Sequence, residues 1–232
     1  MKNDLFHFKQ FVVQQDKCAM KVGTDSVLLG AWAEGGKRIL DIGSGTGVLS
    51  LMMAQRFPEA RVEGVELDGD AFEQAVENAR QSLFVRQIQF HHCPVQDFHS
   101  GKFDSIVSNP PFFVDSLKSP DSLRNQARHS NSLSFHDLFM AVKRLLSDGG
   151  VFSAIIPKDC LELFETEAYH SGLFITRKIE IKTTEKKAIK RVLLAFRYYR
   201  SLAYEQQIVC LLDKTNERSE WYYRLTKDFY VR

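Results

Sequence analysis

The sequence predicts an α/β protein in which helices cover both faces of a mostly parallel sheet. Short β-rich runs alternate with stretches of helical periodicity along most of the chain, which is typical of parallel strands joined by crossover helices. The chain has 232 residues, enough for one such domain with its own core. No repeat, low-complexity stretch or linker divides it, so we expect a single domain over residues 1–232.

The N-terminal part predicts a small hairpin and a helix. Residues 6–22 alternate enough for a hairpin, and residues 24–33 favour a short helix. We expect residues 1–34 to precede a core at 35–200, with a C-terminal strand and tail at 201–232.

Each core element has its own signal. A glycine-rich loop ends the strand at 38–42 and opens a helix at 47–56, and two prolines end the strand at 103–108. Ser134 followed by Asp137 resembles a capping box, and Gly149 and Gly150 are expected to stop that helix. The expected strands are 38–42, 61–66, 87–92, 103–108, 151–156, 173–182 and 190–199, the last two joined by a charged turn. The expected helices are 47–56, 70–82, 134–146 and 159–170.

The composition is that of a globular protein, with 44% apolar and 26% charged residues. We find no charged start followed by an apolar region and no apolar run near ~20 residues, so neither secretion nor a membrane span is indicated. The four cysteines are far apart and form no C-x-x-C spacing. We therefore expect a cytoplasmic protein with reduced cysteines.

The sequence His91-His92-Cys93 is the one candidate for a metal cluster. Adjacent residues on a strand point to opposite faces, so these side chains cannot converge on one ion without distortion. We expect no metal site.

Positive charge is concentrated in the C-terminal third. Residues 1–150 carry 16 Lys and Arg against 18 Asp and Glu, whereas residues 151–232 carry 15 against 11. Between Arg177 and Arg200 there are nine basic residues and two acidic ones. This stretch is compatible with a phosphate-binding surface and equally with a solvated charged hairpin.

The most informative motif is Asn109-Pro110-Pro111-Phe112. It follows a predicted buried strand, and two prolines fix their own backbone angles. The turn therefore holds Asn109 and Phe112 at the carboxyl end of a strand, where open α/β sheets bind their ligands. An amide beside a backbone carbonyl can accept both hydrogens of an exocyclic amino group, and an aromatic ring can stack on its base.

A second motif lies about sixty residues upstream, where Gly43-Ser44-Gly45-Thr46-Gly47 closes a strand and opens a helix. Its G-x-G-x-G spacing differs from the phosphate loop and from the dinucleotide G-x-G-x-x-G pattern. About twenty residues further on, Glu66 ends the next strand, where a carboxylate can accept both ribose hydroxyls of a nucleoside. Asp97, after the third strand, is placed to accept a hydrogen bond from an adenine amino group.

Together these motifs resemble those of Rossmann-like methyltransferases that use S-adenosylmethionine. The resemblance implies a seven-stranded sheet, mostly parallel, with an antiparallel C-terminal strand pair and helices on both faces. It implies that the cofactor contacts come from Asp41, Gly43, Ser44, Gly45, Gly47, Glu66, Leu67, Asp97 and Asn109. Asp41 would act through the loop or the cofactor's amino group, and Asp97 with Val95 or Phe98 would hold the adenine.

The Asn-Pro-Pro-aromatic turn resembles that of the methylators of amino groups in DNA, RNA and release factors. Their common problem is a nitrogen whose lone pair is delocalised into a ring or carbonyl. The resemblance implies that Asn109 and the Pro110 carbonyl bind the two N–H groups and that Phe112 stacks on the base. Transfer then depends on positioning and electrostatics and requires neither a strong base nor a cysteine nucleophile.

The flanking segments are more specific than the cofactor loop. Residues 8–11, 15–25 and 225–230 resemble the bacterial family that methylates N6 of adenine 37 in valine tRNA, so tRNA is the implied partner. Asp25 would border the pocket or cap its helix. The residues implied to contact RNA are Phe112, Arg128, Lys186, Lys187, Lys190 and Arg191. Arg128 and His129 lie in a loop, residues 115–131, that we expect over the site.

Other functions remain open at this point. A methylator of guanine N2 in ribosomal RNA or of glutamine in a release factor would use the same chemistry. A cofactor-binding RNA module without turnover is an alternative from another class. A DNA enzyme usually needs a target-recognition insertion for which this chain has little room, and an NAD-type dehydrogenase has no use for the double-proline turn.

Overall fold

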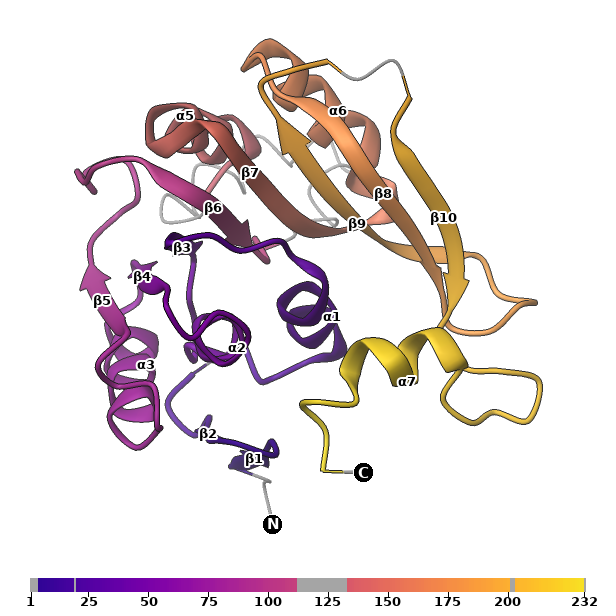
Figure 1. The fold of residues 1–232 in the computed structure, drawn as a ribbon, viewed down its shortest axis with the longest axis horizontal. Helices are drawn as coiled ribbons and strands as arrows, with labels where there is room; N and C mark the ends of the chain where they lie inside the picture. Colours follow the sequence, from indigo (N-terminus) through magenta and orange to yellow (C-terminus); the bar gives the residue numbers. More distant parts are fainter. Residues whose placement is uncertain (1–3, 19, 112–132, 201–202, 232) are drawn as a thin grey trace, which may run out of the picture.

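The computed structural model describes residues 4–18, 20–111, 133–200 and 203–231. The predicted roles of Phe112, Arg128 and His129, and the predicted loop at 115–131, lie outside the described residues. Within them, eight strands form the central sheet, and β1 and β2 form a separate hairpin (Figure 1).

The central sheet has the strand order β10-β8-β9-β7-β6-β3-β4-β5. Strand β9 is antiparallel to both of its neighbours, and every other adjacent pair is parallel. The strands are β1 Leu5–His7, β2 Val12–Gln14, β3 Arg38–Ile42, β4 Arg61–Glu66, β5 Ile88–His92, β6 Phe103–Ser108, β7 Leu146–Pro157, β8 Phe174–Lys182, β9 Ile189–Arg197 and β10 Glu205–Cys210. The α/β fold with a mostly parallel sheet is therefore confirmed.

The predicted number of strands in this sheet, seven, was wrong by one. Strand β10, which the sequence assigned to a C-terminal segment outside the core, pairs in parallel with β8 and becomes the edge of the sheet. A short run of alternating residues indicates a strand but does not identify its partner, because pairing is decided by tertiary contacts.

The helices are α1 Thr24–Trp32, α2 Val48–Arg56, α3 Gly69–Arg80, α5 Phe135–Leu145, α6 Leu161–His170 and α7 Glu220–Thr226, with a 3-10 turn at Lys158–Cys160. The predicted cap of α5 is present, since Ser134 Oγ accepts the Asp137 amide at 3.0 Å. The predicted stop was wrong. The helix ends at Leu145, and Gly149 and Gly150 lie within β7. Helix α7 was not predicted, although Ser219 caps it by accepting the Tyr222 amide.

Apolar side chains pack on both faces of the sheet. On one face, α5 and α6 cover a cluster that includes Phe139, Phe152, Phe164 and Phe196, all fully buried. On the other face, α1, α2 and α7 pack over residues such as Ile155 (Figure 1). Residues adjacent on a strand alternate between these clusters, which is the arrangement that crossover helices on both faces require.

The two ends of the chain meet in a third cluster. Phe8 and Phe11 of the N-terminal hairpin pack with Phe229 against Leu51 and Met52 of α2. The Lys9 amide donates to the Phe229 carbonyl at 2.8 Å, which joins the two ends through the backbone. The flanking motifs thus have a structural role beside any role in substrate recognition.

Buried amides on α3 hold the N-terminal segment in place. Asn78, 1% exposed, accepts from the Gln14 amide and donates to the carbonyls of Gln14 and Thr46. Gln74, fully buried, accepts from the Lys17 amide at 3.0 Å. These contacts fix the course of the chain just before Cys18.

We expect Asn78→Ala to lower the free energy of unfolding by about 2–4 kcal/mol, because it leaves buried backbone groups without partners. Urea denaturation followed by circular dichroism measures this change. Arg80→Ala, at an exposed position of the same helix, is the matched control and should stay within about 0.5 kcal/mol. Equal effects of the two substitutions would contradict the anchoring role of Asn78.

Candidate active site

The site lies where the order of the strands reverses direction. From β3 the chain continues to β4 and β5 on one side, and β6 and β7 pair on the other. The carboxyl ends of β3 and β6 are adjacent, and Ser108 Oγ donates to the Ile42 carbonyl at 2.8 Å across them. Open α/β sheets bind ligands at such a switch point.

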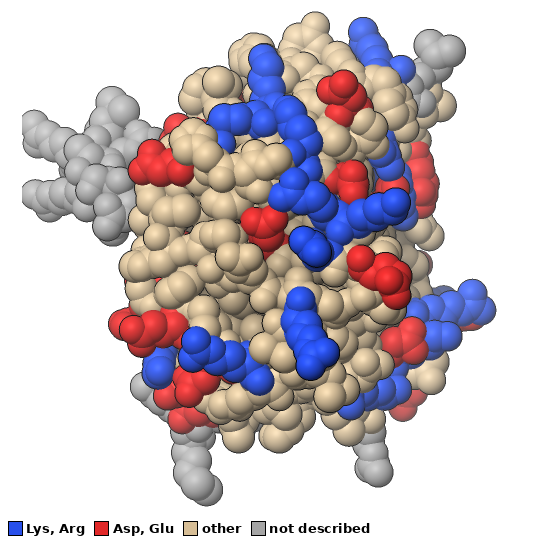
Figure 2. Space-filling model, turned by 60° about the vertical axis from the view of Figure 1, so that its left-hand side comes forward, with Lys and Arg blue, Asp and Glu red and all other residues tan. Residues whose placement is uncertain are grey.

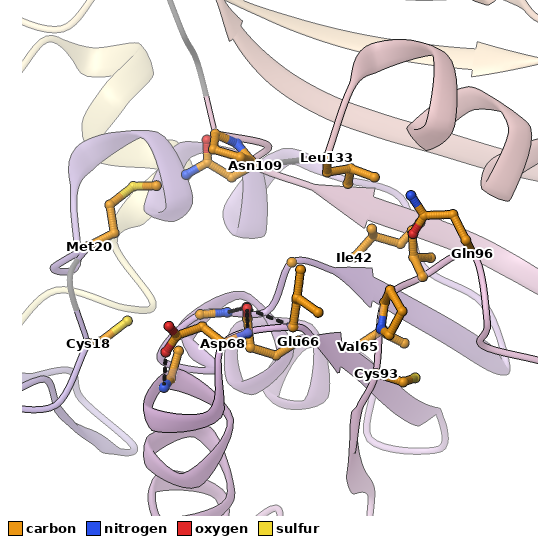
Figure 3. Close-up of a pocket in the computed structure, with 17 residues that line it drawn as sticks. Cys18, Met20, Ile42, Val65, Glu66, Asp68, Cys93, Gln96, Asn109 and Leu133 are labelled. Atoms are coloured by element: carbon orange, nitrogen blue, oxygen red, sulfur yellow. Dashed lines mark hydrogen bonds between the residues drawn. The ribbon is translucent and has the colours of Figure 1, made fainter. Parts of the chain in front are cut away.

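A cavity of about 580 Å³ opens at this edge (Figure 3). Its wall consists of Cys18, Met20, Ile42, Gly43, Gly45, Val65, Glu66, Leu67, Asp68, Ala71, Cys93, Pro94, Val95, Gln96, Asn109, Pro111 and Leu133. Apolar side chains make up much of it, and a few polar groups face in. Asn109 lies across the cavity from Glu66 and Asp68 (Figure 3).

The glycine-rich loop forms the floor on the β3 side. Gly43, Gly45 and Gly47 have φ values of 73°, 53° and 78°, a region that other residues rarely adopt. At Gly47 a Cβ would also lie 2.9 Å from Phe90 Cζ, so helix α2 could not pack as closely. Around Gly43 and Gly45 the space is open, which lets a ligand approach the backbone.

Glu66 is fixed by three backbone amides. Its Oε2 accepts from Gly45 at 2.7 Å, and its Oε1 accepts from Leu67 and Asp68 at 2.9 Å each. The carboxylate therefore connects the glycine loop to the start of α3, where Asp68 caps the helix by accepting from Ala71. Each carboxylate oxygen has two acceptor positions, so Oε2 retains one for a ligand hydroxyl.

Asp41 lies behind the loop and outside the cavity wall. It is 1% exposed, and its Oδ2 accepts from Ser50 Oγ of α2 at 2.7 Å. Its Oδ1 is buried with no hydrogen-bond partner among the described residues. Burial, opposed by the hydrogen bond from Ser50 and aided by the nearby Glu66 carboxylate, raises the pKa of Asp41 to about 7.

Asn109 follows β6 and has one end of its amide engaged. Its Nδ2 donates to Ser26 Oγ of α1 at 3.0 Å. Its Oδ1 is buried and has no partner among the described residues. A buried acceptor at a cavity wall without a donor is a position for a ligand N–H or O–H.

Other predicted residues lie beside the cavity. Asp97 is exposed and Gln96 occupies the wall in its place, while Val95, named with Asp97, also lines it. Ser44 is buried, and its hydroxyl has no hydrogen-bond partner among the residues that the structure describes. Pro110 is buried next to Pro111, which lines the cavity.

The sequence analysis missed the N-terminal wall. Cys18 and Met20 line the cavity because Gln74 and Asn78 hold the preceding residues against α3. Burial raises the pKa of the Cys18 thiol. Asp68 was also missed, although an acidic residue just before a helical pattern is a known start signal.

The basic stretch from Arg177 to Arg200 divides into two groups. Arg177 and Arg197 both pair with Glu34, and Lys178 pairs with Glu165. Arg191 donates its Nε to Asp25 at 2.7 Å and an Nη to the Lys190 carbonyl. Asp25 thus anchors α1 to β9 and is not in the cavity wall.

The second group is unpaired. Lys186, Lys187 and Lys190 are exposed and have no ion-pair partner among the described residues. They lie at the turn between β8 and β9, on the same carboxyl edge as the cavity. On the face in Figure 2, Lys and Arg side chains form a band with Asp and Glu beside them.

Within the described parts of the chain, no group of three or more His, Cys, Asp and Glu could hold a metal ion. His91 contacts Glu63 and Phe98, whereas His92 stacks on Phe72. Among the same residues, no helix combines the length and apolar character needed to cross a bilayer.

Known proteins that resemble this chain give its family. The methyltransferase small domain model matches residues 19–158. The tRNA1(Val) (adenine(37)-N6)-methyltransferase of Bacteroides fragilis is 43% identical over the full length of both chains. That of Phocaeicola vulgatus is 47% identical over 100% of this chain and 99% of its own. This chain belongs to the tRNA1(Val) (adenine(37)-N6)-methyltransferase family.

Solved structures agree on the fold of this family member. A predicted O-methyltransferase of Agrobacterium tumefaciens has a TM-score of 0.68 at 17% identity, over 88% of this chain and 96% of its own. Pyrococcus horikoshii TYW2, solved in complex with MeSAdo, has a TM-score of 0.59 at 17% identity, over 85% of this chain and 71% of its own. Identities this low support the Rossmann-like methyltransferase fold alone.

The cavity fits S-adenosylmethionine, the cofactor of such methyltransferases. Gly43 and Gly45 leave space for close backbone approach, and Glu66 offers an acceptor for a ribose hydroxyl. Ile42, Val65 and Val95 supply apolar surface for a flat ring. The carboxylates of Glu66 and Asp68 at one end suit a cofactor that carries positive charge.

The buried carboxyl of Asp41 should make stability fall as pH rises. In the unfolded chain this group ionises near 3.8, and in the folded protein near 7, so ionisation favours the unfolded state between these values. We expect Asp41→Asn to raise the free energy of unfolding at pH 8 by on the order of 3 kcal/mol and to have little effect below pH 4.

Urea denaturation at pH 4, 6 and 8 measures this effect, with exposed Asp70→Asn as the control. An Asp41→Asn protein that is less stable than the wild type at pH 8 would show that the ionised carboxyl stabilises the fold. Titration calorimetry should show weaker cofactor binding by this variant if Asp41 acts on the cofactor.

Proposed function

We propose that this protein transfers a methyl group from S-adenosylmethionine to N6 of an adenine in tRNA, adenine 37 in the anticodon loop of valine tRNA. The family supplies the substrate, because its relatives are named for this reaction. The observation that supports the chemistry is the unpartnered Oδ1 of Asn109 at the wall of the cofactor cavity. The whole chain would act as one catalytic domain in the cytoplasm.

The adenine amino nitrogen is a poor nucleophile because its lone pair is delocalised into the ring. In our proposal Asn109 Oδ1 accepts one N–H and the Pro110 carbonyl accepts the other. These two acceptors polarise the N–H bonds and so increase the electron density on the amino nitrogen. They also orient the nitrogen toward the cavity, and such preorganised dipoles are a major source of catalysis.

When bound, S-adenosylmethionine would supply a methyl group from a positively charged sulfur; the nitrogen would gain this methyl and lose one proton to solvent, and S-adenosylhomocysteine would be the second product. Glu66 would bind the ribose, the Gly43–Gly47 loop would pass beneath the methionine and sugar, and the 95–97 segment with Leu67 would hold the adenine. Asp41 would act through the loop or the amino group.

A base in the anticodon loop must leave its stack to reach this cavity. In our proposal Phe112 stacks on the extruded base, as aromatic side chains do in single-strand recognition. Arg128 is proposed to contact RNA phosphate.

Exposed lysines on the same sheet edge support an RNA-binding surface. Lys190 is on β9, two strands from β6, and Lys186 and Lys187 are in the turn between β9 and β8, the third strand from β6, a displacement of about 10 to 14 Å at the usual strand spacing. A groove beside them is lined by Lys182, Lys186 and Lys214 among others. The lysines and the remaining Nη of Arg191 would bind phosphates on either side of the target base.

Methyl transfer from radiolabelled S-adenosylmethionine to unmodified total tRNA tests this function, with ribosomal RNA, total protein and duplex DNA as parallel acceptors. We expect label in tRNA that digests to N6-methyladenosine. Label in ribosomal RNA as N2-methylguanosine, or in a release factor, would show that this other acceptor is the substrate in place of tRNA. Cofactor binding without any transfer would favour a non-catalytic RNA-binding module.

We expect Asn109→Ala to reduce kcat by at least roughly 100-fold and to leave the Kd for S-adenosylhomocysteine within about threefold. The reason is that the lost contact is made at the reacting nitrogen. Single-turnover methylation gives the rate, and titration calorimetry gives the affinity. A parallel loss of both would mean that Asn109 acts through the cofactor.

Replacing Lys186, Lys187 and Lys190 together by Ala should weaken tRNA binding about tenfold at low salt and reduce the salt dependence of log Kd. Filter binding at several salt concentrations measures both. A matched triple change of Lys37, Arg61 and Lys102 removes exposed cations at the opposite, amino edge of the sheet and should have little effect. Equal effects of both triple changes would indicate only a general charge effect.

A further inference from the structure

The orientation of the Asn109 amide decides whether the site offers an acceptor or a donor. With Oδ1 toward the cavity, the side chain can accept a hydrogen bond from an amino group of the substrate. If the amide were turned by 180° about its last bond, its own NH₂ would face that amino group, and two donors would meet. The torsion of an Asn amide is broad and has two nearly equivalent settings, so the backbone alone does not choose between them.

One contact fixes the opposite end of this amide. Asn109 Nδ2 donates to Ser26 Oγ at 3.0 Å, and Oδ1 is buried without a partner among the described residues. The two residues are 83 positions apart in the sequence and belong to different elements. Ser26 is in the first turn of α1, a helix that packs on α2 and on the sheet.

The start of α1 is itself held firmly. Asp25, the neighbour of Ser26, accepts from Arg191 Nε of β9 at 2.7 Å. Val27, the next residue, is fully buried in the cluster that joins the two ends of the chain. A hydroxyl carried between a fixed ion pair and a buried side chain has little freedom to move away from Asn109.

We propose that Ser26 is a positioning residue for methyl transfer: its hydroxyl accepts from Asn109 Nδ2 and holds the amide at the cavity wall with Oδ1 toward the incoming amino group. This inference rests on the proposed function of Asn109. Ser26 touches neither the substrate nor the cofactor in this account, since it is absent from the cavity wall. Without its hydroxyl, the amide would lose the contact that holds it at the wall, and the arrangement with Oδ1 toward the amino group would be less populated.

The expected effect is on the rate. Ser26→Ala should lower kcat roughly 10- to 100-fold, because a small displacement of a catalytic group costs this much. KM for tRNA and the Kd for S-adenosylhomocysteine should stay within about threefold. Ser26→Thr retains the hydroxyl and should restore at least part of the lost rate.

Thr24→Ala is the matched control. Thr24 is an exposed hydroxyl residue in the same helical turn, and its removal should change kcat less than about twofold. The decisive comparison is a double-mutant cycle, in which Ser26→Ala added to Asn109→Ala should cause no further loss of rate. Additive losses would show that Ser26 does not act through Asn109 and would overturn the proposal.

A second measurement tests the hydrogen bond between Ser26 and Asn109 directly. Its result depends neither on a general effect of the substitution on folding nor on which substrate the enzyme methylates. In ¹⁵N-labelled protein, the side-chain amide signals of Asn109, identified by their loss in Asn109→Ala, should shift in Ser26→Ala and remain in place in Thr24→Ala. Unshifted signals would refute the hydrogen bond whichever acceptor the enzyme methylates. If the wild type labels no tRNA, the proposed function fails, while this measurement still decides the role of Ser26.

Discussion

The adjacency of β3 and β6 is the constraint on which the rest of the site depends. These strands are distant in sequence, yet their carboxyl ends lie side by side, and Ser108 ties the end of one to the Ile42 carbonyl of the other. The glycine loop follows one strand and the Asn-Pro-Pro turn follows the other. The glycine-loop backbone and the Asn109 amide therefore face one cavity without any long connecting loop.

Hydrogen bonds around this junction connect the glycine loop, α1, α3 and the N-terminal segment to one another. Glu66 joins the glycine loop to the start of α3, and α3 holds the N-terminal segment through Gln74 and Asn78. On the other side, Ser26 joins α1 to Asn109. Because buried polar groups are costly when unpaired, each contact favours one arrangement over its alternatives.

Polar atoms without partners among the described residues indicate where a ligand could bind. Asn109 Oδ1 and Asp41 Oδ1 are buried and lack partners among the described residues, as does the Ser44 hydroxyl of the glycine loop. The basic side chains divide in the same way. Arg177 and Arg197 pair with Glu34, whereas Lys186 and Lys187 have no ion-pair partner in the part of the chain that the structure describes and are exposed for contact with a polyanion.

Much of the fold and the outline of the site could be predicted from the sequence. The strands β3, β4 and β6 have the expected bounds. Each is an apolar run whose end is marked in the sequence, by a glycine, by a carboxylate or by the two prolines. The glycine loop, Glu66 and Asn109 were predicted to share one site, and Gly43, Gly45, Glu66 and Asn109 do line one cavity, because local backbone geometry restricts which residues stand at these strand ends.

What the sequence by itself determined is therefore the set of local elements and the motifs at their ends. Only the tertiary structure decided that β10 joins the sheet, that Cys18 and Met20 form a wall of the cavity, and that Arg191 pairs with Asp25. It also decided the contact of Ser26 with Asn109. The physical reason is that these contacts join residues far apart in the chain, and neither periodicity nor spacing records which distant surfaces meet when the chain packs.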